Sequence, residues 1–557
     1  MRGKKSINYS ILKQLMSKSR QFKLPAQIDY IVLYTFLYKY CSDNIREYLL
    51  LELKDKEVTI DEAYKNDAYQ EIISFDALKL YGFYIKKSDA FIEEVVYNNY
   101  QKPGFLPDFL KYFPENIIFS SEYHNLEYFN ELFTTIENNV DALEFGSETV
   151  RNISEIIYLI SQLDVFDADF EFRDVFNIVS SSRLMHMRPN PEYITQILSK
   201  LVLAGKKEIT SVYDPFMKDA SSIMKIYESK GFGLKYCYGK DESKLNYLYT
   251  IVKLFINDFS FNNVFLKQEN AMDSVDINGA SFDAILSRIP IAIKNYYSSN
   301  VKQNMEIVKR SKRSELENIL LENFGMDGDS FKQDVELISA LENLVDKINL
   351  DNDSSQDLIG EYESLRDSEF LFLINLIDSL NPDGIMAISI SENFLFKESL
   401  ETLRKYLTLG KNYIDTIIRI PNEIVRSRPE VVIVFKKNKS KEDILFIDMT
   451  SDYNTQKSRL IYSGSMWRNL ILDDYTINKM ADVFLNKLTI AKFSNLVSIN
   501  EIQDNNFNLS VSRYVDTFEG EFLTLEDVVL EKKEIESKID ELNLKIEKMM
   551  RELNISL

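Results

Sequence analysis

Short apolar runs alternate with amphipathic helical spacing through the middle of this chain. From Glu208 to Ile291 the sequence reads as a strand, a tight turn and a helix, then a strand ending in an acid, a helix and two more strands. Strands that alternate with helices predict a doubly wound α/β sheet. In such sheets the turn after the first strand faces an adenosine-containing ligand at the helix N-terminus, and the acid accepts the ribose hydroxyls. We therefore expect a Rossmann-like domain with its ligand site at this edge.

Residues 1–175 follow helical spacing and predict an N-terminal helical domain. Apolar and aromatic residues are so dense in IDYIVLYTFLYKYCSD, residues 28–43, that this helix must be buried on most sides. The acidic stretch 164–174 marks the expected domain boundary. Pro191 suits the first turn of the following helix, with Asn190 as its cap, and that helix leads into the sheet.

The sheet domain is expected to span residues 176–490. A charged, helix-favouring insertion at 294–367 interrupts it, and the runs DTIIRIP and EVVIVFKKN that follow predict paired strands near the sheet edge. Residues 491–557 form a C-terminal segment whose helix, 523–554, has apolar residues every three or four positions, with Lys532 in one of them. This heptad pattern predicts either a coiled-coil helix with a partner or a helix that packs back on its own domain.

Charge and composition narrow the functional classes. The 557 residues carry a net charge of −21, which argues against a protein that coats nucleic acid non-specifically but allows a local basic groove or a basic partner. Two cysteines and two histidines form neither a disulfide framework nor a zinc-ligand cluster, so we expect no metal and a reducing cytoplasmic location. No apolar run is long enough to span a bilayer, so no membrane partner is expected.

Six stretches of the chain resemble one known family. They are FLYKYCSD, LYGFYIKKSDAF, RPNPEYITQIL, NPDGIMAISISENFLF, IIRIPNEIVRSRPEVVIVFKKN and, at residues 505–519, NNFNLSVSRYVDTFE. In content and order they resemble the modification (M) subunit of type I restriction–modification systems over nearly the whole chain. The resemblance implies a class I methyltransferase-like sheet domain, S-adenosylmethionine as the methyl donor and adenine N6 in DNA as the methylated group.

The cofactor motif departs from the family pattern. The family has aspartate-proline, two residues, then glycine-x-glycine, whereas Asp214 and Pro215 are followed here by Lys218 and Ala220 at the glycine positions. Glycines let the backbone turn tightly and approach the cofactor closely. Lys218 also brings a cation to where the sulfonium would lie. Asp241 matches the ribose-binding acid, and a solvated acid at a strand end is the alternative interpretation.

The catalytic motif departs further. The family has asparagine-proline-proline-aromatic after a strand, whereas the strand FDAIL leads here to Arg288, Ile289, Pro290 and Ile291. In the family, the asparagine carbonyl accepts hydrogen bonds from the target amino group, and the aromatic ring stacks on the flipped adenine. Arg288 is a donor without an acceptor, and Ile291 removes stacking worth about 1–3 kcal/mol. We therefore expect no intact catalytic residue.

Two alternatives concern the same residues. The run Asn190-Pro191-Glu192-Tyr193 nearly matches the catalytic motif, but SSSRLMHMRP before it is no buried strand, so we do not expect it at a strand's carboxyl end. Lys218 and Arg288 either form a cationic pocket for a phosphate or another anion, or reflect drift in a disused cleft. In either case the degenerate pocket comprises these two residues with Asp214, Pro215, Ala220 and Asp241, and Pro191 leads into it.

These departures predict a catalytically impaired methyltransferase-like subunit. If the subunit binds any cofactor it is S-adenosylmethionine, and we expect none. Its expected role is a DNA-clamping scaffold of an anti-phage defence complex that holds a specificity (S) subunit through the C-terminal helix. A second M-type subunit and a nuclease–translocase subunit are further partners that the resemblance implies. The alternatives are an active adenine-N6 DNA methyltransferase with a divergent site and a nucleotide-sensing regulatory module.

Overall fold

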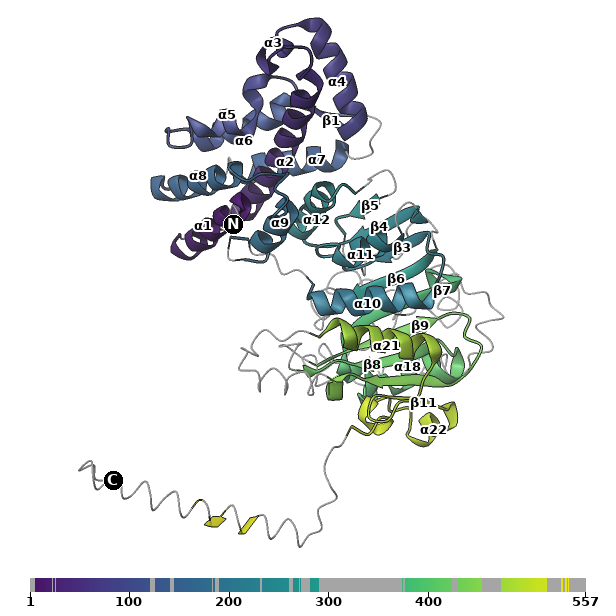
Figure 1. The fold of residues 1–557 in the computed structure, drawn as a ribbon. Helices are drawn as coiled ribbons and strands as arrows, with labels where there is room; N and C mark the ends of the chain where they lie inside the picture. Colours follow the sequence, from purple (N-terminus) through teal and green to yellow (C-terminus); the bar gives the residue numbers. More distant parts are fainter. Residues whose placement is uncertain are drawn as a thin grey trace, which may run out of the picture.

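The structure is a computed structural model, and Figure 1 shows its course. It describes residues 6–289 and 373–517 apart from short gaps, and a few positions between 532 and 539. The longest gaps are 121–125, 141–144, 186–189, 260–263, 272–280, 423–428 and 453–471. The expected insertion 294–367, almost all of the expected helix 523–554, and the site residues Pro290 and Ile291 lie outside the described residues.

Helices and a small antiparallel sheet make up the first third of the chain. Ser6, Thr59 and Asn66 start three of the helices by accepting backbone N–H groups of the first turn. The elements are α1 (Ile7–Gln21), α2 (Ile28–Leu53), α3 (Ile60–Tyr64), α4 (Asp67–Tyr81), β1 (Phe83–Ile85), α5 (Ile92–Tyr97), α6 (Phe105–Asn116), β2 (Ile117–Phe119), α7 (Leu126–Val140), α8 (Ser147–Ser161) and α9 (Phe172–Ser180).

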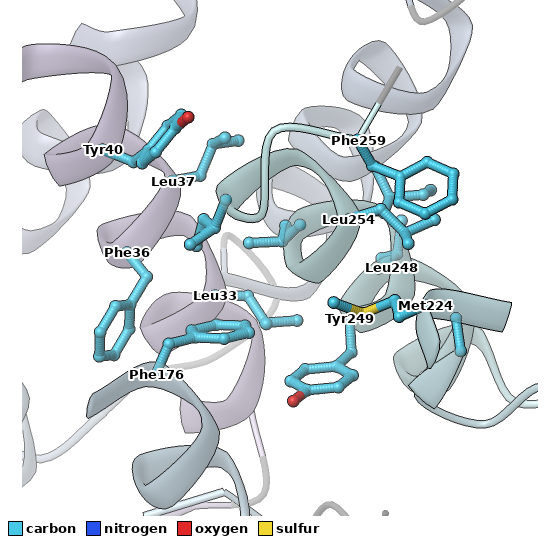
Figure 2. Packing of buried hydrophobic residues seen from close by; sticks show 14 of the residues in the cluster. Leu33, Phe36, Leu37, Tyr40, Phe176, Met224, Leu248, Tyr249, Leu254 and Phe259 are labelled. Carbon is cyan, nitrogen blue, oxygen red and sulfur yellow. The ribbon is translucent and has the colours of Figure 1, made fainter. Parts of the chain in front are cut away.

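Helix α2 is the buried axis of this part, as its aromatic density predicts. Tyr34 and Tyr38 are fully buried, and their hydroxyls donate to backbone carbonyls of Phe109 at 2.8 Å and Ala90 at 2.6 Å. Buried tyrosines of this kind are stable because both the ring and the hydroxyl find partners. Figure 2 shows Leu33, Phe36, Leu37 and Tyr40 of the same helix facing other apolar side chains.

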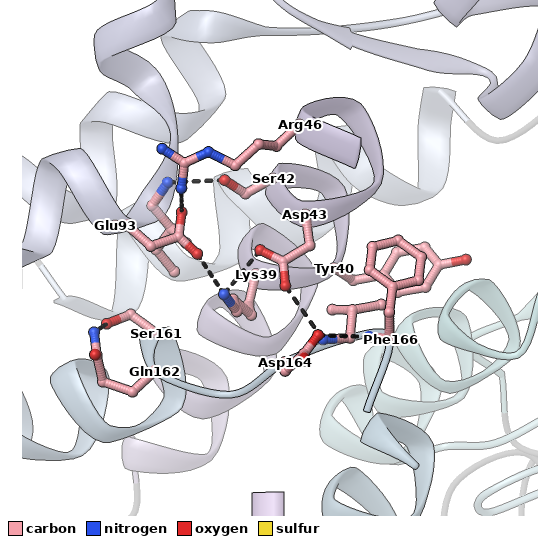
Figure 3. Close-up of polar contacts among 12 residues, drawn as sticks. Lys39, Tyr40, Ser42, Asp43, Arg46, Glu93, Ser161, Gln162, Asp164 and Phe166 are labelled. Atoms are coloured by element: carbon pink, nitrogen blue, oxygen red, sulfur yellow. Dashed lines mark hydrogen bonds and ion pairs between the residues drawn. The ribbon is translucent and has the colours of Figure 1, made fainter. Parts of the chain in front are cut away.

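A buried ionic network joins α2 to its neighbours (Figure 3). Lys39 Nζ lies 2.8 Å from Asp43 Oδ1 and also contacts Glu93 of α5, which Arg46 approaches to 3.3 Å. The Val165 N–H donates to Asp43 Oδ2 at 3.2 Å. Burial raises the pKa of Asp43 to about 7. The network therefore fixes α2 against α5 and against the segment that precedes α9.

The helical part and the sheet share one hydrophobic core. Phe255 of α12 (Lys244–Ile256) lies among four rings of the helical part, with centroid distances of 5.6 Å to Tyr40, 5.5 Å to Phe83, 6.4 Å to Phe119 and 4.9 Å to Phe129. Aromatic pairs at such distances pack edge to face and add to the burial of apolar area. The helical part is thus held to the sheet through α12, the helix that follows the acid-tipped strand.

The sheet has nine strands among the described residues, in the order β11-β10-β8-β9-β7-β6-β3-β4-β5. Strand β9 runs antiparallel to both of its neighbours, β11 runs antiparallel to β10, and the other neighbouring pairs are parallel. The strands are β3 (Ser211–Asp214), β4 (Tyr236–Lys240), β5 (Val264–Lys267), β6 (Phe282–Arg288), β7 (Leu380–Ser391), β8 (Ile414–Arg419), β9 (Glu430–Lys436), β10 (Ile444–Asp448) and β11 (Ser494–Val497).

Both faces of the sheet are buried, as a doubly wound α/β sheet requires. In β9, Val432 and Val434 join the core cluster on one face, whereas Ile433 and Phe435 join a second cluster on the other face. Figure 1 shows α10 and α21 side by side over the first face. The remaining helices of this part are α10 (Glu192–Gly205), α11 (Ser221–Lys230), α18 (Glu401–Lys405), α21 (Asp474–Asn486) and α22 (Ile499–Asp504).

The two late strands pair as predicted, but their predicted place near the sheet edge is wrong. Strands β8 and β9 are antiparallel neighbours, with Ile417 opposite Ile433. Strand β9 lies inside the sheet, between β7 and β8, and β10 and β11 extend the sheet beyond β8. The short run ILFID forms β10, and it displaces the expected pair from the edge.

The segment 505–516 packs against the second face of the sheet through a buried arginine. Arg404 is 2% exposed, and its guanidinium donates to the carbonyls of Phe507 at 2.7 Å, Phe394 at 3.1 Å and Lys397 at 2.8 Å. The Leu509 N–H donates to another carbonyl of the same region at 2.8 Å. Among the helices of the described residues, none combines the length and apolarity needed to cross a bilayer.

Candidate functional site

The predicted site residues meet at the carboxyl ends of three neighbouring strands. Asp214 ends β3, Asp241 follows β4, and Arg288 ends β6. Strand β3 lies between β4 and β6 in the sheet, with parallel pairing on both sides. The carboxyl edge of a parallel sheet is where α/β proteins form their ligand sites. The topology therefore brings the three motifs together as the sequence predicts.

The turn after β3 has the backbone conformation that glycine favours, although Lys218 and Ala220 stand where the family pattern has glycine. Lys218 has φ +48° and Ala220 has φ +51°, both in the left-handed region. A non-glycine residue in this region costs on the order of 1–3 kcal/mol. Three hydrogen bonds hold the turn: Met217 N–H to Lys240 O at 3.0 Å, Ala220 N–H to Met217 O at 2.7 Å, and Lys218 N–H to Asp241 Oδ2 at 3.0 Å. These contacts offset the strain and preserve the shape of the turn.

Asp214 is fully buried at the start of the turn. Its Oδ1 accepts hydrogen bonds from Ser287 Oγ at 2.6 Å and from the Phe216 N–H at 3.1 Å. Its Oδ2 is buried and has no hydrogen-bond partner among the described residues. Burial raises the pKa of Asp214 to about 7, and the two hydrogen bonds oppose this rise. The turn thus contains a carboxyl group with one acceptor oxygen unused.

Asp241 occupies the position expected for a ribose-binding acid, but the chain itself already uses it. Its carboxylate accepts the Lys218 N–H at 3.0 Å, the Ser243 N–H at 2.8 Å and Asn246 Nδ2 at 3.0 Å. A carboxylate offers about four acceptor positions, so roughly one stays open to a ligand. Burial raises the pKa of Asp241, and these hydrogen bonds lower it. The interpretation of Asp241 as a solvated strand-end acid is wrong, because the residue is 8% exposed.

Asp219 in the same turn is neutralised from outside the turn. Lys253 Nζ of α12 lies 2.9 Å from Asp219 Oδ2, and both side chains are buried. The Asn190 N–H reaches Asp219 Oδ1 at 3.5 Å, and this contact places the Asn190–Pro191 lead-in beside the turn. Asn190 Oδ1 is buried without a hydrogen-bond partner among the described residues.

Arg288 forms a two-pronged ion pair with Glu430, the first residue of β9. Arg288 Nε donates to Glu430 Oε2 at 2.9 Å, and Nη2 donates to Glu430 Oε1. Ser389 Oγ of β7 donates to Glu430 Oε2 at 2.9 Å. The glutamate side chain is 2% exposed and that of Arg288 is 18% exposed. Bidentate pairs of this kind are strong and geometrically specific. The guanidinium of Arg288 is therefore neutralised and fixed.

Lys218 differs from Arg288 in that its charge is not paired with a carboxylate among the described residues. Within the described part of the chain, no carboxylate forms an ion pair or side-chain hydrogen bond with its ammonium. Burial lowers the pKa of Lys218, the positive charge of Arg288 lowers it further, and Asp219, Asp241 and Glu430 act in the opposite direction. Charges of both signs therefore act on this ammonium.

The structure brings Asp214, Lys218, Asp241 and Arg288 together, whereas Glu430 was not foreseen from the sequence. Its only signal is an acid directly after a proline at the start of the run EVVIVF. Lys253 and Ser389 also contact the site and carry no distinguishing sequence signal, because one lies in a helix and the other in a strand of ordinary pattern. Ile289, beside Arg288, is buried in the core of the second sheet face.

These residues fit one part of the methyl donor that the resemblance implies. An acid after β4, a left-handed turn after β3 and buried, unpartnered acceptors suit an adenosine group with donor substituents. Lys218 forms no ion pair with a carboxylate among the described residues, and its ammonium would repel a sulfonium placed beside it. The residues of the site therefore suit the nucleoside part of the donor better than its cationic centre.

Comparison with known proteins agrees with this topology. The family model described as N-6 DNA Methylase matches residues 346–521. The chain is 23% identical over 558 residues to the type I restriction enzyme MpnII methylase subunit of Mycoplasma pneumoniae, which covers 94% of this chain and 92% of that protein. A stretch of 159 residues, 28% of this chain, is 30% identical to 26% of the MjaVII methylase subunit of Methanocaldococcus jannaschii.

A solved structure shows the same fold over almost the full length. The methyltransferase subunit of the type I restriction–modification system of Streptococcus thermophilus superposes with a TM-score of 0.63 at 18% identity, covering 92% of this chain and all of that one. Sequence relatives and fold thus agree along the whole chain, and the resemblance inferred from its motifs is confirmed. The chain is similar in sequence and in fold to type I restriction–modification methylase subunits over more than nine tenths of its length.

Proposed function

We propose that this chain is a methylase-type subunit that holds DNA and a specificity subunit within a type I restriction–modification-like complex without transferring methyl groups. The observation that carries the proposal is the ion pair between Arg288 and Glu430 at the carboxyl edge of the sheet. By the resemblance, Arg288 takes the position of the asparagine that accepts hydrogen bonds from the adenine amino group.

The chemistry explains why this position matters. Transfer of a methyl group to the exocyclic nitrogen of adenine forms an N–C bond, breaks the S–C bond of the donor and releases a proton from the nitrogen. An amide carbonyl assists by accepting the hydrogens of the amino group, whereas a guanidinium has five donors and no acceptor. Arg288 would present N–H groups to an amino group that also presents N–H groups. The expected consequence is that the nitrogen is not activated.

The ion pair also resists displacement by a substrate. The carboxylate of Glu430 accepts hydrogen bonds from both Arg288 and Ser389, and its side chain is 2% exposed. Separating such a pair leaves a buried charge uncompensated, at a cost of about 3–5 kcal/mol. A flipped base that entered here would have to supply this energy in addition to the cost of its own unstacking.

The proposed partners follow from the relatives, which are methylase subunits of type I restriction enzymes. We assign to this chain DNA, a specificity subunit bound through the C-terminal helix 523–554, a second M-type subunit and a nuclease–translocase subunit, in the bacterial or archaeal cytoplasm. The net charge of −21 implies that much of the positive charge needed to bind DNA comes from the partner subunits. An anti-phage role would follow from membership of such a complex.

A radiolabel assay tests the proposal. The chain is co-purified with its specificity subunit and given DNA with S-adenosylmethionine that carries a labelled methyl group, and DNA retention is measured on the same preparation. We expect DNA binding without incorporation of label. Incorporation above that of a preparation lacking the specificity subunit would overturn the proposal. A matched Arg288→Asn/Glu430→Gln variant restores an acceptor without leaving an unpaired charge, and any gain of label on this variant would support it further.

One observation favours a second candidate, an active adenine-N6 methyltransferase with a divergent site. The turn after β3 retains its left-handed backbone at Lys218 and Ala220, and Asp241 remains at its edge. Under this alternative the wild-type complex incorporates label, and Asp241→Asn abolishes incorporation. The same assay therefore separates the two functions.

A further inference from the structure

A groove opens on the surface of the helical part, far from the carboxyl edge of the sheet. Its lining comes from the second half of α2, the turn into α3 and the segment 88–94. Its volume of about 680 Å³ lies within the range of about 300–1,000 Å³ that is usual for ligand sites. Figure 1 shows α3 at the end of the helical part that is remote from the sheet. The groove is therefore a separate site, on elements that the proposed function does not use.

The floor of the groove is apolar, and one wall leaves apolar surface in water. Leu49, Leu53 and Phe91 line the groove and belong to the buried core. Leu50 lines it as well, yet this residue is 53% exposed. Removal of apolar surface from water is the main favourable term in most protein association. The groove therefore gains most from an occupant that brings apolar side chains to Leu50 and to the floor.

Two sets of contacts hold the shape of the groove. Arg46 pairs with Glu94 at 3.1 Å, and its guanidinium lies over the Phe91 ring, 5.4 Å from the ring centroid. Thr59 and Glu62 form a capping box that fixes the start of α3. A preformed groove costs its partner less ordering entropy than one that must assemble on binding.

Negative charge prevails at the rim of the groove. Four of its lining residues are acidic and two are basic. Because Arg46 and Glu94 pair with each other, the remaining rim charges are those of Glu57, Asp61, Asp89 and Lys54. The surface around the groove has the same sign, since the segment 47–62 holds six acidic residues and two lysines. Such a rim repels phosphate and attracts a cationic partner.

We propose that this groove docks a basic amphipathic segment of another polypeptide, with large apolar side chains on the floor and lysine or arginine at the rim. A small apolar molecule would stay partly in water beside the exposed Leu50. An amphipathic helix instead covers such a wall with its apolar face, and its flanking cations reach carboxylates such as Glu57 and Asp61. The charge complementarity of the rim thus assigns this face of the chain to a protein partner and not to nucleic acid.

Fluorescence anisotropy with the full-length chain and labelled peptides tests the docking. The probe is a synthetic helix-forming peptide of leucine and lysine, with every leucine on one face. One comparison peptide carries glutamate in place of every lysine, and the other carries serine in place of every leucine. We expect the leucine–lysine peptide to bind about tenfold or more tightly than either comparison peptide. Equal binding of the glutamate peptide, equal binding of the serine peptide, or no binding of any peptide would each overturn the proposal.

Leu50 and Leu51 provide a matched pair of variants for the apolar wall. They are adjacent on α2 and are 53% and 65% exposed, but Leu50 lines the groove and Leu51 does not. Leu50→Ala removes part of the wall and should weaken binding of the leucine–lysine peptide about fivefold or more. Leu51→Ala should change this affinity by less than about twofold. The same loss in both variants would show that the peptide binds elsewhere on the surface.

A second matched pair tests the rim charge. Glu57→Gln/Asp61→Asn removes two rim carboxylates and should weaken the leucine–lysine peptide about fivefold. Glu47→Gln/Asp55→Asn removes two exposed carboxylates of the same segment outside the groove and should have less than about twofold effect. Equal effects would reduce the attraction to the net charge of the surface and refute the docking site. Light scattering completes the test, because a dimer that Leu50→Ala dissociates would make the occupant a second copy of this chain and overturn the proposal.

Discussion

Arg288 and Glu430 meet across β7, a strand to which neither belongs. Arg288 stands opposite Ser389 in the β6–β7 pairing, and Glu430 stands opposite Ser391 in the β7–β9 pairing. Ser389 also donates to the glutamate, so one side chain from each of three adjacent strands takes part in the contact. The pair therefore joins β6 and β9, which are not neighbours in the sheet, at the carboxyl end of β6.

This relationship predicts strong coupling between the two residues. Glu430→Gln or Arg288→Met alone leaves a mostly buried charge without its partner and should lower the free energy of unfolding by about 3 kcal/mol. The double variant Arg288→Met/Glu430→Gln removes both charges, so its loss should be smaller than the sum of the single losses by about 2 kcal/mol. Urea denaturation followed by fluorescence gives the free energy of unfolding of the wild-type chain, the single variants and the double variant. Additive losses would mean that the two side chains do not depend on each other.

Much of the sheet could be predicted from the sequence because short apolar runs and helical spacing are local signals. The alternation in EVVIVF places successive side chains on opposite faces, as Val432 and Ile433 show. The position of β9 inside the sheet could not be read in this way. Strand order is decided by pairing between segments far apart in sequence, and the short β10 and β11 gave little pattern to indicate that they extend the sheet beyond β8.

The candidate site was predictable in its members and not in its electrostatics. Asp214, Asp241 and Arg288 each end or follow a strand, so sequence order alone places them at one edge. Sequence alone did not indicate that Glu430, 142 positions away, pairs with the Arg288 guanidinium. A pairing over that separation depends on the fold. Lys218, by contrast, forms no ion pair with a carboxylate within the described part of the chain.

Because Lys218 adopts a left-handed backbone conformation, we expect glycine at position 218 to give a more stable protein than alanine. Lys218→Gly and Lys218→Ala lose the same charge and the same side-chain stem, so their difference reports the backbone. At φ +48° the glycine variant should be more stable than the alanine variant by about 1 kcal/mol. Lys225 in α11 provides the reverse case, where glycine should be less stable than alanine by about 1 kcal/mol. Thermal and urea unfolding measure both pairs, and the same sign at both positions would contradict the prediction.

Asp214 predicts a dependence of stability on pH. Burial raises its pKa from 3.8 to about 7, so the folded chain holds a proton that the unfolded chain has released. Its contribution to stability is present in full below pH 3.8 and is lost as the pH rises through about 7. Between these two pH values, Asp214 changes the free energy of unfolding of the wild-type chain by up to about −1.4 kcal/mol per pH unit. Asp214→Asn removes this titrating group, so the plot of unfolding free energy against pH should become less steep by that amount.

A second buried acid provides the control for this measurement. Burial raises the pKa of Asp43 to about 7 as well, but Asp43 lies in the network with Lys39 and Glu93, far along the chain from the turn. The two acids should contribute separately, so Asp43→Asn leaves the part of the slope that Asp214 causes. Urea midpoints at several pH values between 5 and 8 provide the data. A wild-type curve that rises with pH over this range and is unchanged in Asp214→Asn would contradict the assignment.

Arg404 determines whether the segment 505–516 stays on the sheet domain. Its guanidinium donates to three backbone carbonyls, including that of Phe507, which adopts φ +52°. Lysine has a single ammonium and cannot reproduce this planar set of donors, so Arg404→Lys should release the segment almost as fully as Arg404→Met. Hydrogen exchange of residues 505–516 should rise in both variants and stay unchanged in Arg513→Met, whose side chain is exposed. If the segment positions the C-terminal helix for the specificity subunit, the affinity of the complex should fall in parallel. Unchanged exchange in Arg404→Met would show that apolar contacts alone hold the segment.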